Sequence, residues 1–201
     1  MENEKKILEI IEKKGLITNK DIIDNNIPKS ALNRLIKKAD VEKVKNGVYN
    51  LKDTLTDEYY LLLYGNKDAV YSYFTALYFH GLCEMVPQIY DITVKKNYGG
   101  NLQKNKKVRL HYVEDTIFEL GKTTIKSPQG QEIIVYDVER CLCDIIKNQE
   151  NLYFEYVKYA FNEYYKVQKH DTFKLYKYAR IMGIEEKVSN FMGVLLWIVW
   201  V

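Results

Sequence analysis

The chain has 201 residues, 47% of them hydrophobic and 28% charged, so it can bury a core and is not globally disordered. Its formal net charge is only +3, and its three cysteines do not form the even set of a disulfide framework. Residues 1–14 have a charge-rich helical pattern unlike a signal sequence. The longest apolar run, at residues 194–201, is far shorter than the roughly 20 residues that cross a bilayer. We therefore expect a cytoplasmic protein that does not enter the membrane.

Positive charge and aromatic residues divide the chain at the same place. Residues 1–52 carry 12 basic against 8 acidic residues, whereas residues 53–201 carry 18 against 19. A single aromatic residue, Tyr49, precedes residue 53, and the polar segment 51–56 lacks periodicity. We therefore predict two domains, residues 1–52 and residues 53–201.

Two short helices are predicted at the N-terminus. The apolar spacing in residues 5–14 fits one buried helical face, and Gly15 ends that helix. Thr18 caps a second helix, which carries Ile22 and Ile23 on its inner side. With the third helix and the hairpin that follow, they can close a small core, which we expect to be marginal in isolation and to lean on the rest of the chain.

A third helix and a β-hairpin come next. The residue before Pro28 is pushed away from helical dihedrals, so the third helix begins at residues 29–30. Its buried stripe is predicted to contain Ala31, Leu32, Leu35, Ile36 and Ala39. Asn46-Gly47 joins two β-prone runs, 41–44 and 48–51, which predicts a hairpin with a type I′ turn. This order of elements is typical of a winged helix-turn-helix, a DNA-binding fold.

The polar residues of this segment suit double-stranded DNA. On the outer face of the third helix, Arg34 suits guanine and Asn33 suits adenine. Lysines of the hairpin and the head of the second helix suit phosphate. The predicted DNA-binding residues are Thr18, Asn19, Lys20, Lys29, Ser30, Asn33, Arg34, Lys37, Lys38, Lys43, Lys45 and Asn46. The alternative is an ordinary solvated surface in a lysine-rich sequence.

Strands followed by helices make the second domain, and the chain as a whole, α+β. Alternating apolar residues predict a mixed or antiparallel sheet of four or five strands. The predicted strands are 70–71, 90–95, 108–113, 122–126 and 132–136, with helices at 57–64 and 72–82. A helical C-terminal part follows, with helices at 137–147, 152–166, 172–182 and 185–201. The tyrosines of residues 153–165 recur at helical spacing, which favours packing in the core over stacking on nucleic-acid bases.

Three cysteines and a histidine raise the question of a metal or a nucleophile. His80 and Cys83 are three residues apart, whereas Cys141 and Cys143 have a spacing unusual for zinc and point apart on a helix. Pairing Cys83 with His80, or Cys143 with Asp144, lacks a third orienting group. Buried structural cysteines are therefore favoured over a zinc site or a nucleophile. For His80, a capping or core role is favoured over a catalytic one.

A nuclease is a further alternative, since Asp91 and Lys95 lie on one predicted strand. The second carboxylate that such a metal-dependent site needs beside Lys95 is absent, and no nucleotide-binding glycine motif occurs. We therefore predict a protein that is not an enzyme, without catalytic residues, cofactor or metal.

Two segments of the second domain carry a family resemblance. Residues 72–82 (SYFTALYFHGL), Pro87 and residues 92–94 (ITV) resemble the S-x-x-T-A-L-x-x-H-G-L … P … x-T-V run of AbiEi-type antitoxins. Residues 136–146 (YDVERCLCDII) are similar to the family's Y-D-x-E-R-T-x-C-D-I-I segment. In front of both, residues 47–49 (GVY) follow a similar helix-turn-helix. The resemblance covers nearly the whole chain.

The resemblance implies an antitoxin of a type IV toxin–antitoxin system of abortive phage infection. Such a protein represses its own operon at inverted repeats through a winged helix. Its C-terminal domain counteracts a nucleotidyltransferase-like toxin, AbiEii, without a tight complex. Cys141 stands where the family often has threonine, and the apolar end at residues 197–201 extends past the usual family boundary. The alternative is a stand-alone regulator whose second domain senses a ligand or dimerises.

Overall fold

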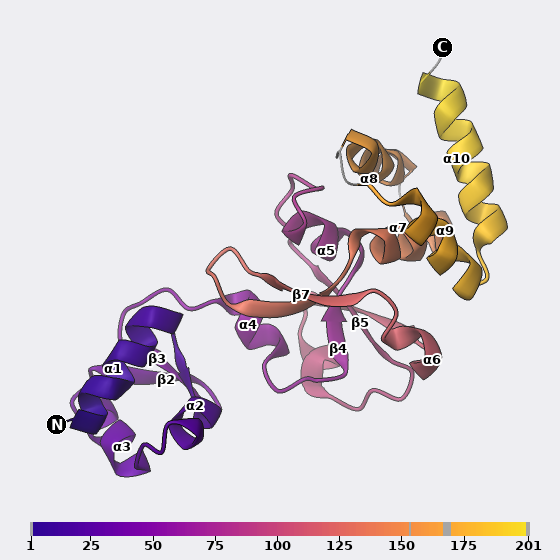
Figure 1. The fold of residues 1–201 in the computed structure, drawn as a ribbon. Helices are drawn as coiled ribbons and strands as arrows, with labels where there is room; N and C mark the ends of the chain where they lie inside the picture. Colours follow the sequence, from indigo (N-terminus) through magenta and orange to yellow (C-terminus); the bar gives the residue numbers. More distant parts are fainter. Residues whose placement is uncertain (1, 153, 167–169, 200–201) are drawn as a thin grey trace. The chain divides into compact units, whose positions relative to one another are not determined.

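A computed structural model describes residues 2–152, 154–166 and 170–199, with side chains up to Gly193. The chain divides into two compact units (Figure 1). Unit 1 runs from the N-terminus to Tyr64 and includes Lys126–Ile133, and unit 2 comprises Gly65–Ile125 and the chain from Ile134 onward. Both helices and sheets are present in each, so the predicted α+β class is confirmed.

Unit 1 contains a small antiparallel sheet and four helices. The sheet has the strand order β1-β3-β2 and comprises β1 (Ile17–Thr18), β2 (Val41–Lys45) and β3 (Val48–Leu51). The helices are α1 (Glu2–Lys14), α2 (Asn19–Asp24), α3 (Lys29–Lys37) and α4 (Glu58–Leu63). The elements predicted for residues 5–51 therefore form in the predicted order.

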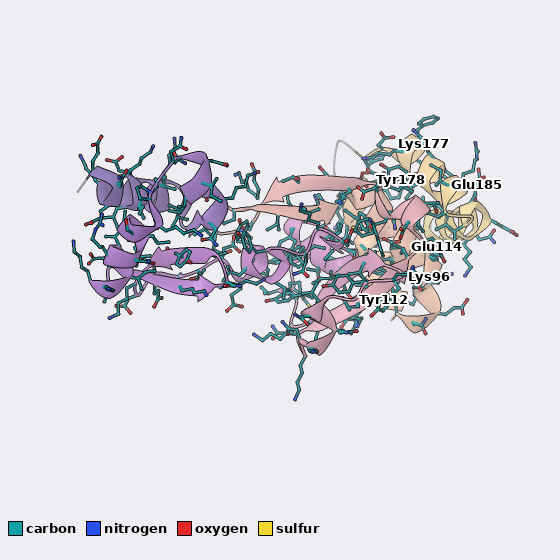
Figure 2. The ribbon with its side chains drawn as sticks, turned by 90° about the horizontal axis from the view of Figure 1, so that it is seen from below. Lys96, Tyr112, Glu114, Lys177, Tyr178 and Glu185 are labelled. Carbon is teal, nitrogen blue, oxygen red and sulfur yellow. The ribbon has the colours of Figure 1, made fainter. Side chains whose placement is uncertain are left out.

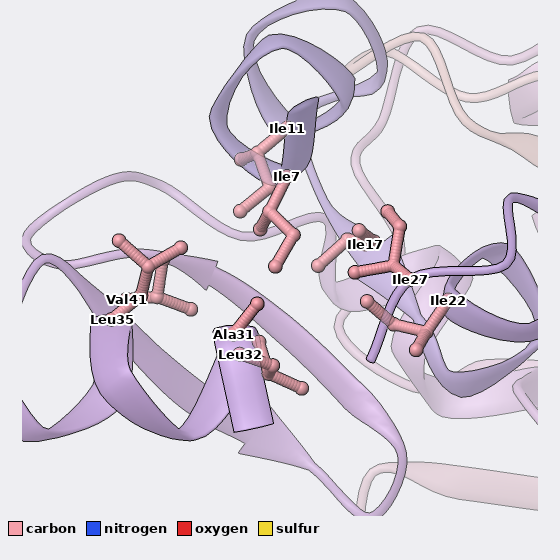
Figure 3. Packing of buried hydrophobic residues seen from close by; sticks show 9 residues of the cluster. All are labelled: Ile7, Ile11, Ile17, Ile22, Ile27, Ala31, Leu32, Leu35 and Val41. Atoms are coloured by element: carbon pink, nitrogen blue, oxygen red, sulfur yellow. The ribbon is translucent and has the colours of Figure 1, made fainter. Parts of the chain in front are cut away.

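Nine buried apolar residues form the main cluster in the core of unit 1 (Figure 3). They are Ile7, Ile11, Ile17, Ile22, Ile27, Ala31, Leu32, Leu35 and Val41. Two predicted core positions are wrong. Ile23 is 67% exposed, because Ile22 already fills the inward position of the short helix α2. Ala39 is exposed with φ +61°, because α3 has ended and the chain turns through a left-handed residue there.

The hairpin turn differs from the predicted type I′. A type I′ turn needs positive φ at both central residues, whereas only Gly47 has one, at +77°. The register shifts between the pairs Lys43–Tyr49 and Lys45–Val48, so β2 carries one extra residue at this end. Such a bulge adds local twist to the strand. The chain therefore reverses direction in this hairpin with left-handed backbone at Gly47 alone.

Helix α4 belongs to unit 1, which differs from the predicted boundary at residue 53. Asp57 caps α4 by accepting from the Tyr60 amide at 3.0 Å, and it also accepts from the Ser127 hydroxyl. At the other end of α4, the Lys45 ammonium donates to the carbonyls of Leu61 and Tyr64, at 2.5 and 3.0 Å. Contacts between segments far apart in sequence thus decide where the first unit ends.

The sheet of unit 2 is mixed, one of the two types that the sequence left open, and has five strands in the order β6-β5-β4-β8-β7. Its strands are β4 (Ala69–Tyr71), β5 (Tyr90–Lys95), β6 (Val108–Val113), β7 (Lys122–Lys126) and β8 (Glu132–Tyr136); the hairpin tip at 126–133 belongs to unit 1. β4 pairs antiparallel with β5, whereas β5 with β6 and β4 with β8 are parallel. The predicted limits of β5 to β8 are confirmed.

Helix α7 (Val138–Lys147) is the centre of the helical part of unit 2. It packs against four other helices, α5 (Tyr73–Phe79), α8 (Phe154–Lys166), α9 (Thr172–Ile181) and α10 (Glu185–Val199), which gather on one side of the sheet (Figure 1). Residues 139–146 are buried all round the helix. The remaining elements are α6 (Asp115–Phe118) and two short 3-10 helices, Asn101–Lys104 and Gln149–Asn151.

Strand β6 is an edge of this sheet. Tyr112, on that strand, is 52% exposed. Nearby, Lys96 and Glu114 form an ion pair with a distance of 2.6 Å between Nζ and Oε1 (Figure 2). Charged residues at an edge discourage pairing with strands of other chains.

Several cysteines and tyrosines were predicted to be buried in the core of unit 2. Cys141 and Cys143 are buried, as predicted, and their thiols face the carbonyls of Tyr136 and Leu175. Tyr164 of α8 is also buried, whereas Tyr156, expected to pack inward, is 46% exposed and packs only in part, with its ring edge-to-face against that of Phe74 at 6.2 Å between centroids. Tyr153 and the side chains of the apolar end at 197–201 lie outside the described residues. Across the described helices, none has the length and apolar character that a membrane span requires.

Candidate nucleic-acid interface

Helix α3 presents a polar face. Its apolar residues Ala31, Leu32 and Leu35 are buried in the core of unit 1. Residues one helical half-turn away from that stripe therefore point to solvent. Exposed side chains on this surface belong to Lys29, Ser30, Asn33 and Lys37. We call these four residues the outer face of α3.

Arg34 and Lys38 lie at one margin of this face, next to α1. The Nε of Arg34 donates to Oε1 of Glu4 at 2.6 Å, and the Nζ of Lys38 donates to Oε2 at 3.0 Å. Glu4 shares its side of α1 with Ile7 and Ile11, which are buried against α3 and the sheet. The carboxylate thus bridges two cations of α3.

The two cations strongly lower the pKa of the Glu4 carboxyl group. Hydrogen bonds from Arg34 and then from Lys38 lower the pKa of Glu4 from 4.5 to about 2. Its side chain is only 12% exposed, whereas that of Arg34 is 51% exposed. Glu4 is therefore ionised throughout the neutral range, and Arg34 remains accessible beyond the contact.

At the head of α2, one of the three residues predicted to bind phosphate is already bonded within the protein. Thr18 is buried, and its side chain forms a capping box with Asp21: its Oγ accepts from the Asp21 amide at 3.1 Å, and its amide donates to the Asp21 carboxylate at 2.9 Å. These bonds occupy the hydroxyl and the amide of Thr18, so this residue is not a free phosphate ligand. Asn19 and Lys20 are exposed, and the Asn19 amide donates to the carbonyl of Gly47 at 2.8 Å.

The hairpin places its predicted DNA-binding residues in different surroundings. Lys43 and Asn46 are exposed. Lys45 is half-buried, and its ammonium is occupied by the two carbonyls at the end of α4. Burial lowers its pKa below the ordinary value of 10.5. Lys45 is thus a cation at a helix C-terminus rather than a free phosphate ligand.

The family-like segment at residues 72–82 forms internal hydrogen bonds of unit 2. Ser72 accepts from the Thr93 hydroxyl at 2.8 Å, and Thr75 accepts from the Asp91 amide at the same distance. His80 ends α5, and its Nε2 lies 2.8 Å from the carbonyl of Tyr136, which agrees with the predicted capping or core role. These side chains hold α5 against the sheet.

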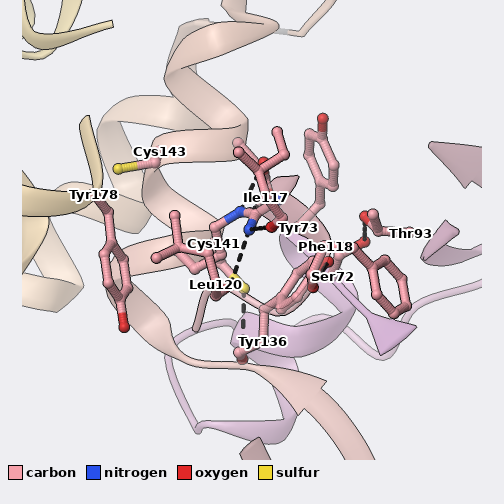
Figure 4. A network of polar contacts seen from close by, with 12 residues as sticks. Ser72, Tyr73, Thr93, Ile117, Phe118, Leu120, Tyr136, Cys141, Cys143 and Tyr178 are labelled. Atoms are coloured by element: carbon pink, nitrogen blue, oxygen red, sulfur yellow. Dashed lines mark hydrogen bonds and ion pairs between the residues drawn. The ribbon is translucent and has the colours of Figure 1, made fainter. Parts of the chain in front are cut away.

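The segment at residues 136–146 is also built into the interior (Figure 4). Arg140 is fully buried beside the ring of Tyr136, and its Nε lies 3.1 and 3.2 Å from the two carboxylate oxygens of Asp144. Its Nη1 donates to the carbonyls of Ile117 and Leu120, at 2.5 and 2.8 Å. Arg140 therefore connects α7 to the end of α6.

Asp137 and Glu139 extend the same network to α9. Asp137 caps α7 by accepting from the Arg140 amide at 2.9 Å. The ammonium of Lys174 lies 3.0 Å from Asp137 and 3.1 Å from Glu139. The polar groups of this motif are thus bonded within the fold, except that Nη2 of Arg140 is buried without a hydrogen-bond partner among the described residues.

The groups considered for catalysis have separate partners. Asp91 accepts from His111 at 2.8 Å, a contact that the sequence did not indicate, whereas Lys95 pairs with Asp68 at 3.0 Å. Burial raises the pKa of Cys143 to about 12, which keeps its thiol protonated and poorly nucleophilic at neutral pH. Where side chains are described, no three His, Cys, Asp or Glu residues converge as metal ligands would.

We compared the chain with protein families, curated proteins and solved structures, and one distant structural likeness is described below. No family model matches the chain, and no curated protein matches it. Among solved structures, the RV2827C protein from Mycobacterium tuberculosis aligns with 93% of this chain and 77% of its own, at 11% sequence identity and a TM-score of 0.46. At this level the likeness carries no argument.

Proposed function

We propose that unit 1 is a winged helix-turn-helix that binds double-stranded DNA. The observation that carries this proposal is the polar outer face of α3, which follows the short helix α2 and precedes the hairpin of β2 and β3. Within the described residues, Lys29 and Lys37 have no ion-pair partner, so their charges are available to an anion. Phosphate binding by such lysines supplies most of the affinity for DNA.

In this proposal α3 enters a major groove. Arg34 contacts guanine and Asn33 contacts adenine, since these side chains match the edges of those bases. Lys29, Lys37 and the hairpin residue Lys43 contact phosphates, which position the protein without reading sequence. Thr18 and Lys45 are left out, because their polar groups are already bonded within unit 1.

We further propose that the chain is a cytoplasmic antitoxin that represses its own operon and counteracts a nucleotidyltransferase-like toxin. The support is the resemblance of residues 72–82 and 136–146 to AbiEi-type antitoxins. Both segments belong to unit 2, whereas the proposed DNA-binding face belongs to unit 1. Toxin neutralisation would then belong to unit 2 and repression to unit 1.

Selection of DNA by the full-length chain tests the first proposal. A duplex selected from a random-sequence library is compared with a scrambled duplex of the same composition. We expect Arg34→Ala to weaken binding of the selected duplex by about 1–3 kcal/mol, and Lys43→Ala to weaken both duplexes alike. The exposed Lys177→Ala of unit 2 is the matched control and changes neither. Failure of the wild-type chain to enrich any sequence contradicts the proposal.

Co-expression tests the antitoxin proposal separately. The gene next to this one in its genome is induced, and growth is followed with and without the full-length chain. We expect wild type and Arg34→Ala to restore growth equally, since the substitution affects only DNA binding. An adjacent gene that is harmless, or growth that the wild-type chain does not restore, contradicts the antitoxin function.

A further inference from the structure

Glu4 joins the first turn of α1 to a helix 30 residues away in sequence. Its two carboxylate oxygens are divided between Arg34 and Lys38, at 2.6 and 3.0 Å. Both cations are more than half exposed, whereas Glu4 is 12% exposed. The carboxylate thus holds two long side chains in place. Without it, these exposed side chains would change rotamer freely.

The contact uses only one part of the Arg34 guanidinium. Glu4 accepts from Nε, and the described contacts leave the two terminal nitrogens of Arg34 without a protein acceptor. Guanine offers two acceptors, O6 and N7, on its major-groove edge, and a guanidinium satisfies both at once when two of its N–H groups point that way. The geometry therefore leaves Arg34 able to make the bidentate contact while its stem is held.

Holding the arginine has a consequence for discrimination between sequences. A long side chain that is ordered before binding loses less conformational entropy when it meets the correct base. The negative charge of Glu4 also offsets Lys38 and Arg34, which reduces their attraction to phosphates of any sequence. Both effects favour a selected site over random DNA.

We propose that Glu4 is a positioning residue that orients Arg34 for base recognition and so determines the sequence specificity of α3. This inference rests on the proposed DNA binding by unit 1. Glu4 itself contacts no base, and its effect passes through Arg34.

The test uses the full-length chain, the selected duplex and its scrambled counterpart. We expect Glu4→Gln to lower the ratio of the two affinities about tenfold, the effect of losing one well-placed base contact, with scrambled DNA bound more tightly. Glu9→Gln, which removes the same charge from the exposed side of α1, leaves the ratio unchanged. In an Arg34→Lys background, Glu4→Gln lowers the ratio no further.

Each result has a defined meaning. If wild type selects a sequence and Glu4→Gln keeps the same ratio, the positioning role is wrong although DNA binding stands. If Glu4→Gln binds both duplexes more tightly by the same factor, Glu4 is only a competing anion, and the inference is again overturned. Glu4→Asp, which keeps the charge on a shorter stem, gives an intermediate ratio and serves if Glu4→Gln does not fold. If wild type selects nothing, the proposed function fails first.

Discussion

Lys45 illustrates how the role of a residue depends on an element that its local sequence does not reveal. Its position beside Asn46-Gly47 predicted a phosphate contact at the tip of a hairpin. Instead its ammonium lies against the carbonyls of Leu61 and Tyr64, which end α4. A lysine in a turn has no sequence signal for this contact, because its partners follow 16 and 19 residues later.

Lys45→Ala is therefore expected to reduce stability. It removes charged hydrogen bonds from two carbonyls, which is worth about 1–2 kcal/mol in a half-buried position. Chemical denaturation of the full-length chain measures the change. Lys43→Ala is the control, since Lys43 is an exposed neighbour on the same strand. Equal unfolding free energies for the two variants would contradict the role assigned to Lys45.

Gly47 is expected to be intolerant of a side chain for two reasons. Its φ of +77° costs an L-residue about 1–2 kcal/mol, and an added Cβ would lie 3.0 Å from the side-chain nitrogen Nδ2 of Asn19. Gly130 also has a positive φ, +89°, but nothing lies within 4 Å of an added Cβ. Gly47→Ala should therefore lower the unfolding free energy more than Gly130→Ala. Equal losses would show that the approach of Asn19 has no cost.

The Glu4 contact predicts a particular pH dependence. Its pKa in the folded chain is about 2, below the ordinary 4.5, so its ionised form is the one that the fold favours. The stabilisation is therefore present above pH 4.5 and is lost as the pH falls toward 2. Thermal unfolding of wild type and Glu4→Gln should differ by a constant amount from pH 5 to 7, less as the pH falls below 4.5, and not at all once it is below about 2. A difference that grows on acidification would contradict this assignment.

At the scale of helices and strands, much of the fold follows from local pattern. Alternation gave the limits of β5 to β8, and Asp57 and Asp137 marked helix starts correctly because capping is a local interaction. The errors lie where neighbouring elements decide. Ile23 and the hairpin turn depend on how a six-residue helix and a bulged strand pack, and periodicity does not report that.

In the candidate site, too, local features can be predicted from the sequence, whereas contacts between elements cannot. The exposure of Ser30, Asn33 and Lys37 follows from helical periodicity, since the opposite stripe is apolar. The bonds that occupy Thr18 are also local and readable, because Asp21 stands at the capping-box position. The bridge from Glu4 to Arg34 is not readable, because it requires the packing of α1 on α3.

Helix α7 makes a prediction about its buried ion pair. Arg140→Met leaves Asp144 buried without its partner, which is expected to cost about 3–5 kcal/mol of unfolding free energy. Replacing both residues, with Arg140→Met and Asp144→Leu, should cost less than the single change. Arg180→Met is the control, because the exposed Arg180–Glu185 pair is worth at most about 1 kcal/mol. A double variant less stable than Arg140→Met would contradict this account.

At the scale of the whole molecule, the unit boundary was the least predictable feature. Composition located a change near residue 53, yet α4 and the hairpin tip at 126–133 complete unit 1. Aromatic content and charge describe only the neighbours of a residue along the sequence. Membership of a unit depends instead on contacts between distant segments, such as that between Ser127 and Asp57.

Ser127→Ala is expected to destabilise unit 1 although it lies far along the chain. Asp57 is buried and would lose a hydroxyl donor to its charged carboxylate, a loss of about 1–3 kcal/mol. Hydrogen exchange of the α4 amides measures the effect locally. Thr124→Ala, at an exposed position of β7, is the control. Unchanged protection of α4 in Ser127→Ala would show that the hydroxyl does not support the cap.

The membership of residues 126–133 in unit 1 has a consequence for synthesis of the protein. A ribosome that has released residue 64 must translate a further 69 residues before Ile133 emerges. At about 5–20 residues per second, this takes roughly 3–14 seconds. During that interval the nascent first unit lacks the segment that supports Asp57. The first unit therefore reaches its full set of contacts only after elongation through much of the second unit, and no single cut in the gene keeps all segments of each unit together.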